Sequence, residues 1–573
     1  MSQTSGLPSS RRRTPLIVAF VALVVALGAL QCRAWNGAPN ADGISYVELA
    51  GRYAQGDLAA IANGYWSPLY PALLGLAMRV AGASGLYYGG GLAPELRVAL
   101  VVNLAVLAFA TFAFSRLVLA LDAAEPETTP RAVRVTRLVL AASLWIWAAI
   151  RLVAATTITP DMLLAAWLML ATAELHALTR EPTSRARIVR LAIVLALGYW
   201  TKAVFFPLVL VAIVVAPVLM RRAERRAATT KLALLALALC APLVAVQSAS
   251  QGHLTFGETG RLNYQWYVGD VPRLVPRVEV SAAPSSDTAA SIVRTSLGPV
   301  LFTGNEPGSF PFWHDPSRFT ERRQAAFSLD AQWRVLRANA HWYRVVAGIF
   351  AILCLVAATA SAVRQRLRLE RILVAGPALT LLALHALTHP EGRLAGAALA
   401  VSLTLLVYLG GAPRSESARP LSLPRIVECA ALLMAAVLAL GRTSNRVSLA
   451  PRPDVRNLAA DLARHGLPAG SHVGVLGSPF GHYWAREAGV RIVLAEDDRA
   501  APTSAPTGAA LVTLATDACA RGVPIDALLW RDESPSVAAG VLALPDGWRM
   551  WRVRQPCDDE VRLAPIAEKQ NPD

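Results

Sequence analysis

The sequence has little charge for its length. Only 16% of its 573 residues are charged, whereas soluble proteins typically contain about 25%. Hydrophobic residues make up 54% of the chain, and the mean hydropathy is +0.42. Apolar runs of roughly 17–22 residues recur along it, and each is long enough to cross a bilayer as a helix. The composition therefore excludes an ordinary soluble protein and predicts an α-helical polytopic membrane protein.

Cysteine is also scarce, and the spacing of the six cysteines matches no metal site. Four of them lie in or beside apolar segments, where cysteine behaves as a small buried hydrophobe. These are Cys32, Cys240, Cys354 and Cys429. The other two, Cys519 and Cys557, lie in the C-terminal tail and could form a disulfide if that tail is exported.

Acidic residues are too few to balance the basic ones, so the net charge is +16. In a soluble chain this excess would indicate a nucleic-acid ligand. Here the arginines concentrate in short loops between apolar segments, as in the cytoplasmic loops of membrane proteins. No basic face with interleaved aromatic residues lies outside those loops. We therefore expect no nucleic-acid partner.

The basic loops set the expected topology. Arg11-Arg12-Arg13 precedes the first apolar run and no small-residue cleavage site follows, so we expect an uncleaved first helix with a cytoplasmic N-terminus. Alternation of basic loops then predicts about eleven spans in the inner membrane, with an extracytoplasmic C-terminus. The expected spans are 15–33, 95–120, 137–156, 161–178, 188–201, 203–220, 231–249, 343–362, 372–388, 394–411 and 425–441.

The chain is expected to divide near residue 441. Residues 1–441 would form the transmembrane domain, with outer loops 34–94 and 250–342 that are too long to be turns. The first loop contains an expected interfacial helix from Ser45 to Ala54. Residues 442–573 would form a small extracytoplasmic α/β domain, because short apolar strands alternate with helical patterns. The strands are expected at 472–476, 491–495 and 527–530.

An acidic residue, Asp42, stands on the first loop to leave the membrane. A carboxylate at the membrane surface can accept the proton of an attacking hydroxyl group. Asp also favours helix N-caps, so Asp42 could instead cap the helix that begins near Ser45. The residues alone leave both interpretations open.

Three further charged residues are expected near outer helix ends. Asp161 follows Thr159-Pro160, and either serves a site or simply occupies a first helical turn. Arg151 and Lys202 are expected near the outer face, whereas the positive-inside rule favours basic residues on the cytoplasmic side. They would hold a phosphate group, or they would reach to the lipid headgroups.

The segment His389-Pro390-Glu391-Gly392-Arg393 closes the ninth expected span. His389 and Arg393 are candidates for phosphate binding, and Glu391 could orient a substrate. His385 and His389 are four residues apart, a spacing that suits a metal ion. Because no third ligand lies nearby in the sequence, a divalent metal cofactor is left open but not favoured.

These motifs, in this order, resemble the GT-C superfamily of membrane glycosyltransferases. The nearest likeness is to the bacterial branch related to aminoarabinose transferases and protein O-mannosyltransferases, and it covers about the first 410 residues. It rests on Asp42, Trp66-Ser67-Pro68-Leu69-Tyr70-Pro71, Thr159-Pro160-Asp161-Met162-Leu163-Leu164, Thr201-Lys202-Ala203 and His389-Pro390-Glu391-Gly392-Arg393.

The resemblance implies an inverting transfer of a sugar from a polyprenyl-phosphate donor to a hydroxyl-bearing acceptor at the outer membrane face. Asp42 would be the general base, with Asp161 as a second catalytic carboxylate. The donor phosphate would be bound by Lys202, Arg393, Arg151 and His389, and the substrate oriented by Glu391, Tyr46, Trp66 and Tyr70.

Two positions depart from the family pattern. Many relatives carry paired acids in the first loop, whereas Asp42 is followed by Gly43, which argues against a metal-assisted mechanism. The Arg-Tyr of the later motif is here Arg393-Leu394, so the role of Arg393 is less directly implied.

Two other classes of function fit a polytopic membrane protein. A lipid or sugar transporter would be expected to show related halves and interrupted helices, and no internal repeat is evident. A non-catalytic envelope scaffold that binds a polyprenyl lipid is the other alternative.

Overall fold

The computed structural model describes most of the chain. The described residues are 10–35, 37–83, 92–180, 184–220, 225–274, 292–304, 307–319, 327–362, 369–409, 454–477, 480–496, 506–532, 540–554 and 562–563. The expected span at 425–441 lies outside them, as do Cys429 and Cys557.

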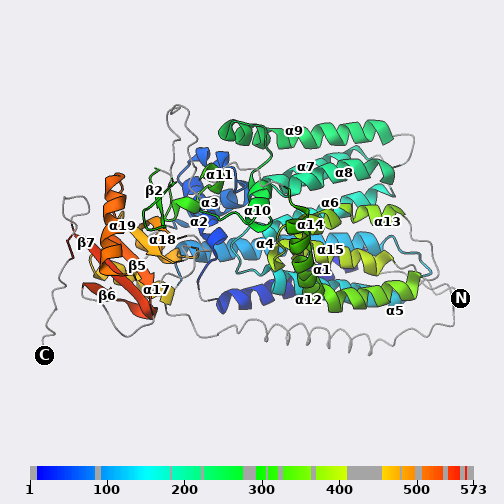
Figure 1. Ribbon diagram of the computed structural model, residues 1–573. Coiled ribbons are helices and arrows are strands. Elements are labelled where there is room, and N and C mark those ends of the chain that lie inside the picture. Colours follow the sequence, from blue (N-terminus) through cyan, green and yellow to red (C-terminus); the bar gives the residue numbers. More distant parts are fainter. Residues whose placement is uncertain are drawn as a thin grey trace.

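A bundle of long helices forms one half of the molecule, and a mixed sheet with its helices forms the other (Figure 1). The bundle contains α1 (Ser10–Arg33), α4 (Pro94–Asp122), α5 (Arg131–Ile146) continued by a π-helical turn (Trp147–Val153), α6 (Asp161–Leu178), α7 (Arg185–Thr201), α8 (Phe205–Leu219), α9 (Arg225–Gln251), α12 (Leu329–Ala362), α13 (Leu369–Val374), α14 (Gly376–Leu387) and α15 (Gly392–Leu409). Within the described part of the chain, each expected span overlaps one or two of these helices: 137–156 continues from α5 into the π-helical turn, and 372–388 is divided between α13 and α14.

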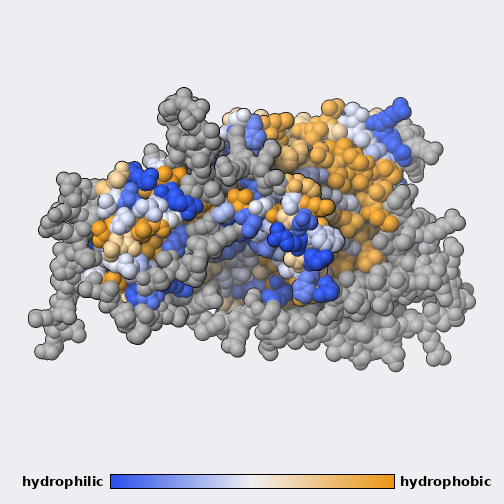
Figure 2. All heavy atoms as spheres, viewed as in Figure 1, coloured by the Kyte–Doolittle hydropathy of each residue, from blue (hydrophilic) through white to orange (hydrophobic). Residues whose placement is uncertain are grey.

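The bundle has the surface of a membrane protein. Five described segments are long and apolar enough to cross a bilayer: Thr14–Arg33, Pro94–Asp122, Val133–Val153, Asp161–Leu178 and Arg225–Gln251. Apolar side chains also point outward from the bundle, with Val214 71% and Leu234 67% exposed. Figure 2 shows them as a continuous hydrophobic area over α7–α9. An apolar surface of this kind is unusual on a soluble monomer, and it suits contact with lipid.

The first outer loop is more compact than expected. It contains α2 (Ala41–Ala54), a 3₁₀ helix (Leu58–Ala62) and α3 (Leu69–Ala81). Residues Gly43–Ala50 of α2 are all buried, so the expected interfacial helix is present but does not lie on the surface. The reason is that α3 covers it closely: a Cβ atom on Gly75 would lie 2.6 Å from the Ala50 carbonyl oxygen. The second outer loop also contacts α2, where the Ser45 hydroxyl donates to the Trp313 carbonyl at 3.1 Å.

The second outer loop carries short elements that reach toward both halves. These are α10 (Thr259–Tyr267), β1 (Ile292–Arg294), β2 (Val300–Phe302), a 3₁₀ turn (Pro311–Trp313) and α11 (Pro316–Phe319). Because β2 pairs antiparallel with β4, opposing Leu301 to Leu494, this loop extends the C-terminal sheet.

The sheet has the strand order β1-β2-β4-β3-β5-β7-β6, with β8 paired to β7. Its parallel centre is formed by β3 (His472–Leu476), β4 (Arg491–Ala495) and β5 (Ala527–Arg531), so the three expected strands are present. The remaining C-terminal elements are α17 (Asp454–Arg464), α18 (Tyr483–Ala488), α19 (Gly508–Ala520), β6 (Val541–Ala543), a 3₁₀ turn (Pro545–Gly547), β7 (Trp548–Arg554) and β8 (Arg562–Leu563). Cys519 on α19 is disulfide-bonded.

A buried ionic contact fastens the sheet to the helix bundle. Glu95, in the first turn of α4, is 1% exposed. It accepts two hydrogen bonds from the Arg486 guanidinium, both at 2.8 Å, and one from the Tyr483 hydroxyl at 2.5 Å. Bidentate charged contacts of this type are among the stronger hydrogen bonds in proteins.

Replacement of Arg486 by Gln is expected to loosen this junction. The change would leave the Glu95 carboxylate buried without its cation, which typically costs about 3 kcal/mol. Thermal unfolding of the purified full chain in detergent measures the effect. Arg521→Gln is the matched control, because Arg521 is exposed and its hydrogen bond to the Arg294 carbonyl is at the surface. Equal melting temperatures for the two variants would contradict a structural role for the junction.

Candidate functional site

Several of the predicted residues meet in one cluster at the end of the bundle nearest the sheet. Arg393 lies at its centre, with one nitrogen 2.7 Å from Asp42, another 3.6 Å from Asp161 and the third 2.7 Å from Glu391. Lys202 adds a second cation, 2.6 Å from Asp161. The helices α2, α6, α7 and α15 each begin or end at this point. Residues far apart in sequence therefore form one charged site.

Asp42 does not cap α2, contrary to one of the two open interpretations. The cap is Asn40, whose side chain accepts a hydrogen bond from the Gly43 amide at 3.0 Å. Asp42 instead lies in the first turn, where the helix dipole stabilises a carboxylate. Its side chain is 22% exposed. Its carboxylate is therefore available to the cavity that it lines.

Asp161 and Lys202 form the buried side of the cluster. Asp161 begins α6 directly after Pro160, and its side chain is 2% exposed. It accepts a hydrogen bond from the Thr159 hydroxyl at 2.7 Å. Lys202 has an extended backbone in the short break between α7 and α8, which lets its side chain reach the cluster. Asp161 therefore occupies the first turn of α6 and is also part of the charged cluster.

A cavity of about 180 Å³ opens beside the cluster. Asp42, Lys202 and Arg393 contribute to its charged wall. Seven aromatic side chains form an aromatic wall of the same cavity: Tyr46, Tyr65, Trp66, Trp266, Tyr267, Trp313 and Phe480. A second cavity of about 570 Å³ is also lined by His389, Glu391 and Arg393. The cluster therefore borders two open volumes.

Both outer loops and the sheet domain contribute to the aromatic wall. Trp266 and Trp313 are stacked with ring centres 5.4 Å apart, and Trp66 donates its indole hydrogen to the Trp313 carbonyl at 3.1 Å. Phe480, between β3 and α18, packs edge-on against Trp313 at 4.7 Å. The Arg273 guanidinium lies 5.5 Å from the centre of the Phe480 ring. Stacked rings of this kind present a flat apolar surface with polar edges.

Arg273 and Phe480 were not predicted from the sequence. The aromatic runs at 260–267 and 310–316 signalled the wall contributed by the second outer loop. No comparable signal marked Phe480, because a single aromatic residue between a strand and a helix is ordinary core composition.

The remaining predicted residues have different surroundings. His389 stacks on Tyr267 with ring centres 4.2 Å apart, and it lies 3.3 Å from Glu391. Burial alone would raise the pKa of Glu391, but the hydrogen bond from His389 and the charge of Arg393 outweigh it and hold that pKa well below its usual range. Glu391 is therefore an anion at neutral pH.

Tyr70 and Arg151 are not among the residues that line either cavity. Tyr70 is fully buried and donates its hydroxyl hydrogen to Asn103 at 2.7 Å, which gives it a place in the core. Arg151 lies in the π-helical turn Trp147–Val153. His385 does line the smaller cavity. Among the described residues, no three His, Cys, Asp or Glu side chains are grouped as ligands for one metal ion.

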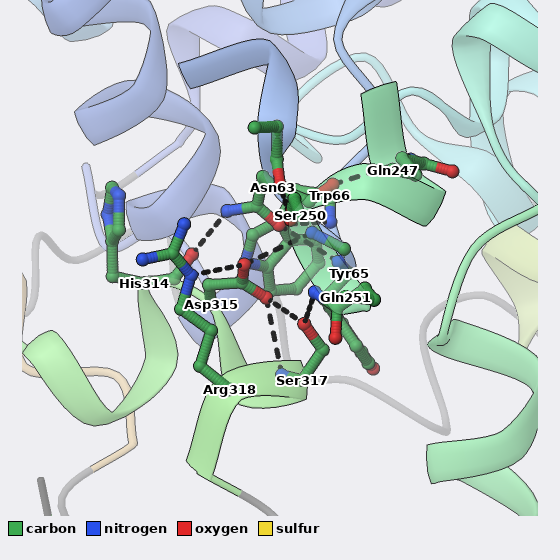
Figure 3. Close-up of polar contacts among 12 residues, drawn as sticks. Asn63, Tyr65, Trp66, Gln247, Ser250, Gln251, His314, Asp315, Ser317 and Arg318 are labelled. Carbon is green, nitrogen blue, oxygen red and sulfur yellow. Dashed lines mark hydrogen bonds and ion pairs between the residues drawn. The ribbon is translucent and has the colours of Figure 1, made fainter. Parts of the chain in front are cut away.

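A polar network joins the two outer loops beside Trp66 (Figure 3). The Asp315 carboxylate accepts hydrogen bonds from the Gly64 amide at 3.1 Å and the Ser317 hydroxyl at 2.5 Å. Asn63 donates its amide hydrogen to the His314 carbonyl at 2.7 Å. These contacts fix the backbone just before Trp66 and just after Trp313, and so help to hold the aromatic wall in place.

His314 makes this network sensitive to acid. Burial, together with the nearby charges of Arg52 and Arg318, lowers the pKa of His314 to about 3. The unfolded chain takes up a proton near pH 6.5, whereas the folded chain does so only near its lowered pKa, so stability falls as the pH falls through this range. At pH 5 the loss from this histidine is about 2 kcal/mol.

We therefore expect the melting temperature to fall between pH 7.5 and pH 5, and to fall less steeply in His314→Gln. Thermal unfolding in detergent at several pH values measures both slopes. His465→Gln is the control, because His465 is exposed. A slope for His314→Gln that equals the wild-type slope would contradict the assignment.

Comparison with known proteins places the fold. No family model matches the chain, and no curated protein matches it in sequence. ArnT from Cupriavidus metallidurans bound to undecaprenyl phosphate superposes on it with a TM-score of 0.53 at 14% identity, over 96% of this chain and 100% of that one. The chain has the ArnT fold.

Two further solved structures give weaker superpositions. ArnT from the same organism in the apo state has a TM-score of 0.48 at 14% identity, over 94% of this chain and 98% of that one. The Archaeoglobus fulgidus oligosaccharyltransferase in the apo form has a TM-score of 0.47 at 12% identity, over 90% of this chain and 69% of that one. The resemblance to GT-C membrane glycosyltransferases predicted from the motifs is confirmed at the level of the ArnT fold.

Proposed function

We propose that this protein transfers a sugar from a polyprenyl-phosphate donor to a hydroxyl group of a lipid, glycan or protein acceptor. The observation that carries the proposal is that Asp42, Lys202 and Arg393 line one cavity together with the residues of the aromatic wall. The ArnT fold adds support, because the superposed ArnT structure is bound to undecaprenyl phosphate.

The chemistry requires a base and a phosphate site on opposite sides of the reacting sugar carbon. In the proposed step, Asp42 accepts the proton of the acceptor hydroxyl as its oxygen attacks that carbon. The bond from the carbon to the phosphate oxygen breaks, and the configuration inverts. Lys202 and Arg393 stabilise the charge that develops on the departing phosphate.

Because Arg393 is paired with Asp42, donor binding would come before Asp42 accepts the proton of the acceptor hydroxyl. Arg393 lies 2.7 Å from the Asp42 carboxylate. A donor phosphate would compete for the same guanidinium and free the carboxylate for the acceptor hydroxyl. Asp161 contacts both cations at 2.6 and 3.6 Å, so its proposed part is to position them.

The aromatic wall would hold the sugar. Sugar rings have apolar C–H faces that pack on aromatic rings, and Trp66, Trp313 and Phe480 present such rings to the cavity. His389 and Glu391, which line both cavities, would orient the donor phosphate and the substrate hydroxyls.

The proposal includes a topology. The site would lie at the outer face of the inner membrane, with the N-terminus cytoplasmic and eleven spans in residues 1–441. Residues 442–573 would lie outside the membrane and place Phe480 over the cavity. The arginine-rich loops at the end of the bundle opposite the site support this orientation.

The test has two parts. Mass spectrometry of envelope glycolipids and glycans, with and without this protein, identifies the product that requires it. The purified chain in vesicles is then given the corresponding polyprenyl-phosphate sugar and acceptor, and sugar transfer with release of polyprenyl phosphate is the expected result. Movement of the lipid or sugar across the vesicle without transfer would replace the proposal with the transporter alternative.

A further inference from the structure

A third cavity lies at the end of the bundle opposite the charged cluster. It has a volume of about 310 Å³ and is formed by the C-terminal ends of α4 and α6 and the start of α7. Four arginines line it, against one glutamate: Arg116, Arg180, Arg187, Arg190 and Glu174. The cavity therefore carries a positive excess.

Among the described residues that line this cavity, one carboxylate faces four guanidinium groups. Glu174 lies 3.0 Å from Arg190 and 3.7 Å from Arg187, and its one carboxylate serves both. Arg180 donates to the Ala123 carbonyl at 2.8 Å, which orders its guanidinium without removing the charge. Such a group of guanidinium ions suits a phosphate, whose oxygens accept hydrogen bonds from several directions.

The mouth of the cavity adjoins the apolar surface of the bundle. Phe112 is 44% exposed and stands one helical turn before Arg116 on α4. Val189 and Ile193, 37% and 42% exposed, flank Arg190 on α7. The small side chains of Ala173 and Ala177 leave space between the helices. A ligand here would have its charge among the arginines and its apolar part against the exposed side chains.

We propose that this cavity binds the phosphate headgroup of an anionic phospholipid. Charge complementarity selects the phosphate, and the continuity with the apolar surface selects a lipid over a soluble anion. Basic pockets between transmembrane helices are known to bind such headgroups. The site is separate from the charged cluster and does not depend on the proposed sugar transfer.

Native mass spectrometry of the full chain, purified in detergent and titrated with dioleoyl phosphatidylglycerol or dioleoyl phosphatidylcholine, tests the proposal. We expect one phosphatidylglycerol to be retained in preference to phosphatidylcholine. The double variant Arg116→Gln, Arg190→Gln should lower that retention by about tenfold or more, because each basic residue contributes to attraction of an anionic lipid. The variant Ala173→Phe keeps every charge, fills the cavity, and should lower retention to a similar extent.

The matched control is the double variant Arg225→Gln, Arg226→Gln. These arginines begin α9 at the same end of the bundle and are not among the residues lining the cavity. Its retention should stay within about twofold of wild type. Equal loss in the control, unchanged retention in Ala173→Phe, or equal retention of both lipids would overturn the proposal. Displacement of the lipid by millimolar inorganic phosphate would instead assign the cavity to a soluble anion. If Arg116→Gln, Arg190→Gln fails to fold, Ala173→Phe decides the outcome.

Discussion

Replacement of Asp42 by Asn is expected to lower the rate of sugar transfer by about 10²- to 10⁴-fold, the usual contribution of a general base. Asn has nearly the same shape as Asp but cannot accept the proton of the acceptor hydroxyl. Single-turnover measurement with preloaded donor reports the chemical step directly. Donor affinity, measured separately by native mass spectrometry, should change by less than about tenfold.

The structure indicates that this variant stays folded. The cap of α2 comes from Asn40, and Arg393 keeps its contacts with Glu391 at 2.7 Å and Asp161 at 3.6 Å. The control is Asp330→Asn, which removes an exposed carboxylate from the first turn of α12. Wild-type turnover in Asp42→Asn would end the assignment of Asp42 as the base. Loss of donor binding without loss of single-turnover rate would instead assign Asp42 to donor binding.

The convergence of the charged residues could be predicted because it follows from topology. Alternating basic loops place Asp42, Asp161, Lys202 and Arg393 at the same ends of their helices. Adjacent helix ends in a bundle must then lie close together. The pattern of charge along one chain was therefore enough to predict a common site, although not which nitrogen contacts which carboxylate.

Contacts between distant segments could not be predicted in the same way. Phe480 reaches the cavity because β2 of the second outer loop pairs with β4 and Glu95 binds Arg486. Neither pairing leaves a periodic signal in the sequence. Whether Asp42 caps the helix was likewise undecided from the sequence, because Asn40 two residues earlier is an equally good cap type and only the backbone geometry selects one.

Replacement of Arg393 by Gln should have the broadest effect of any change in the site. The guanidinium contacts Asp42, Asp161 and Glu391 through three different nitrogens. Its loss leaves three carboxylates with Lys202 as the remaining cation of the cluster, and removal of one partner from a buried ionic network costs about 3–5 kcal/mol. We expect a lower melting temperature together with donor affinity reduced by about 10²-fold, since a charged hydrogen bond to the phosphate is also lost.

Arg393→Lys separates the charge of this residue from its shape. Lysine restores the positive charge but carries a single nitrogen, so it cannot contact three carboxylates from one fixed plane. Its melting temperature should lie between those of wild type and Arg393→Gln, while its KM for the donor stays well above the wild-type value. The control is Arg334→Lys, an exposed arginine on α12. A wild-type KM in Arg393→Lys would mean that the donor phosphate requires only a positive charge at this position. The proposed exchange of Arg393 between Asp42 and the donor would then have no geometric basis, because a single ammonium group could bind either partner equally well.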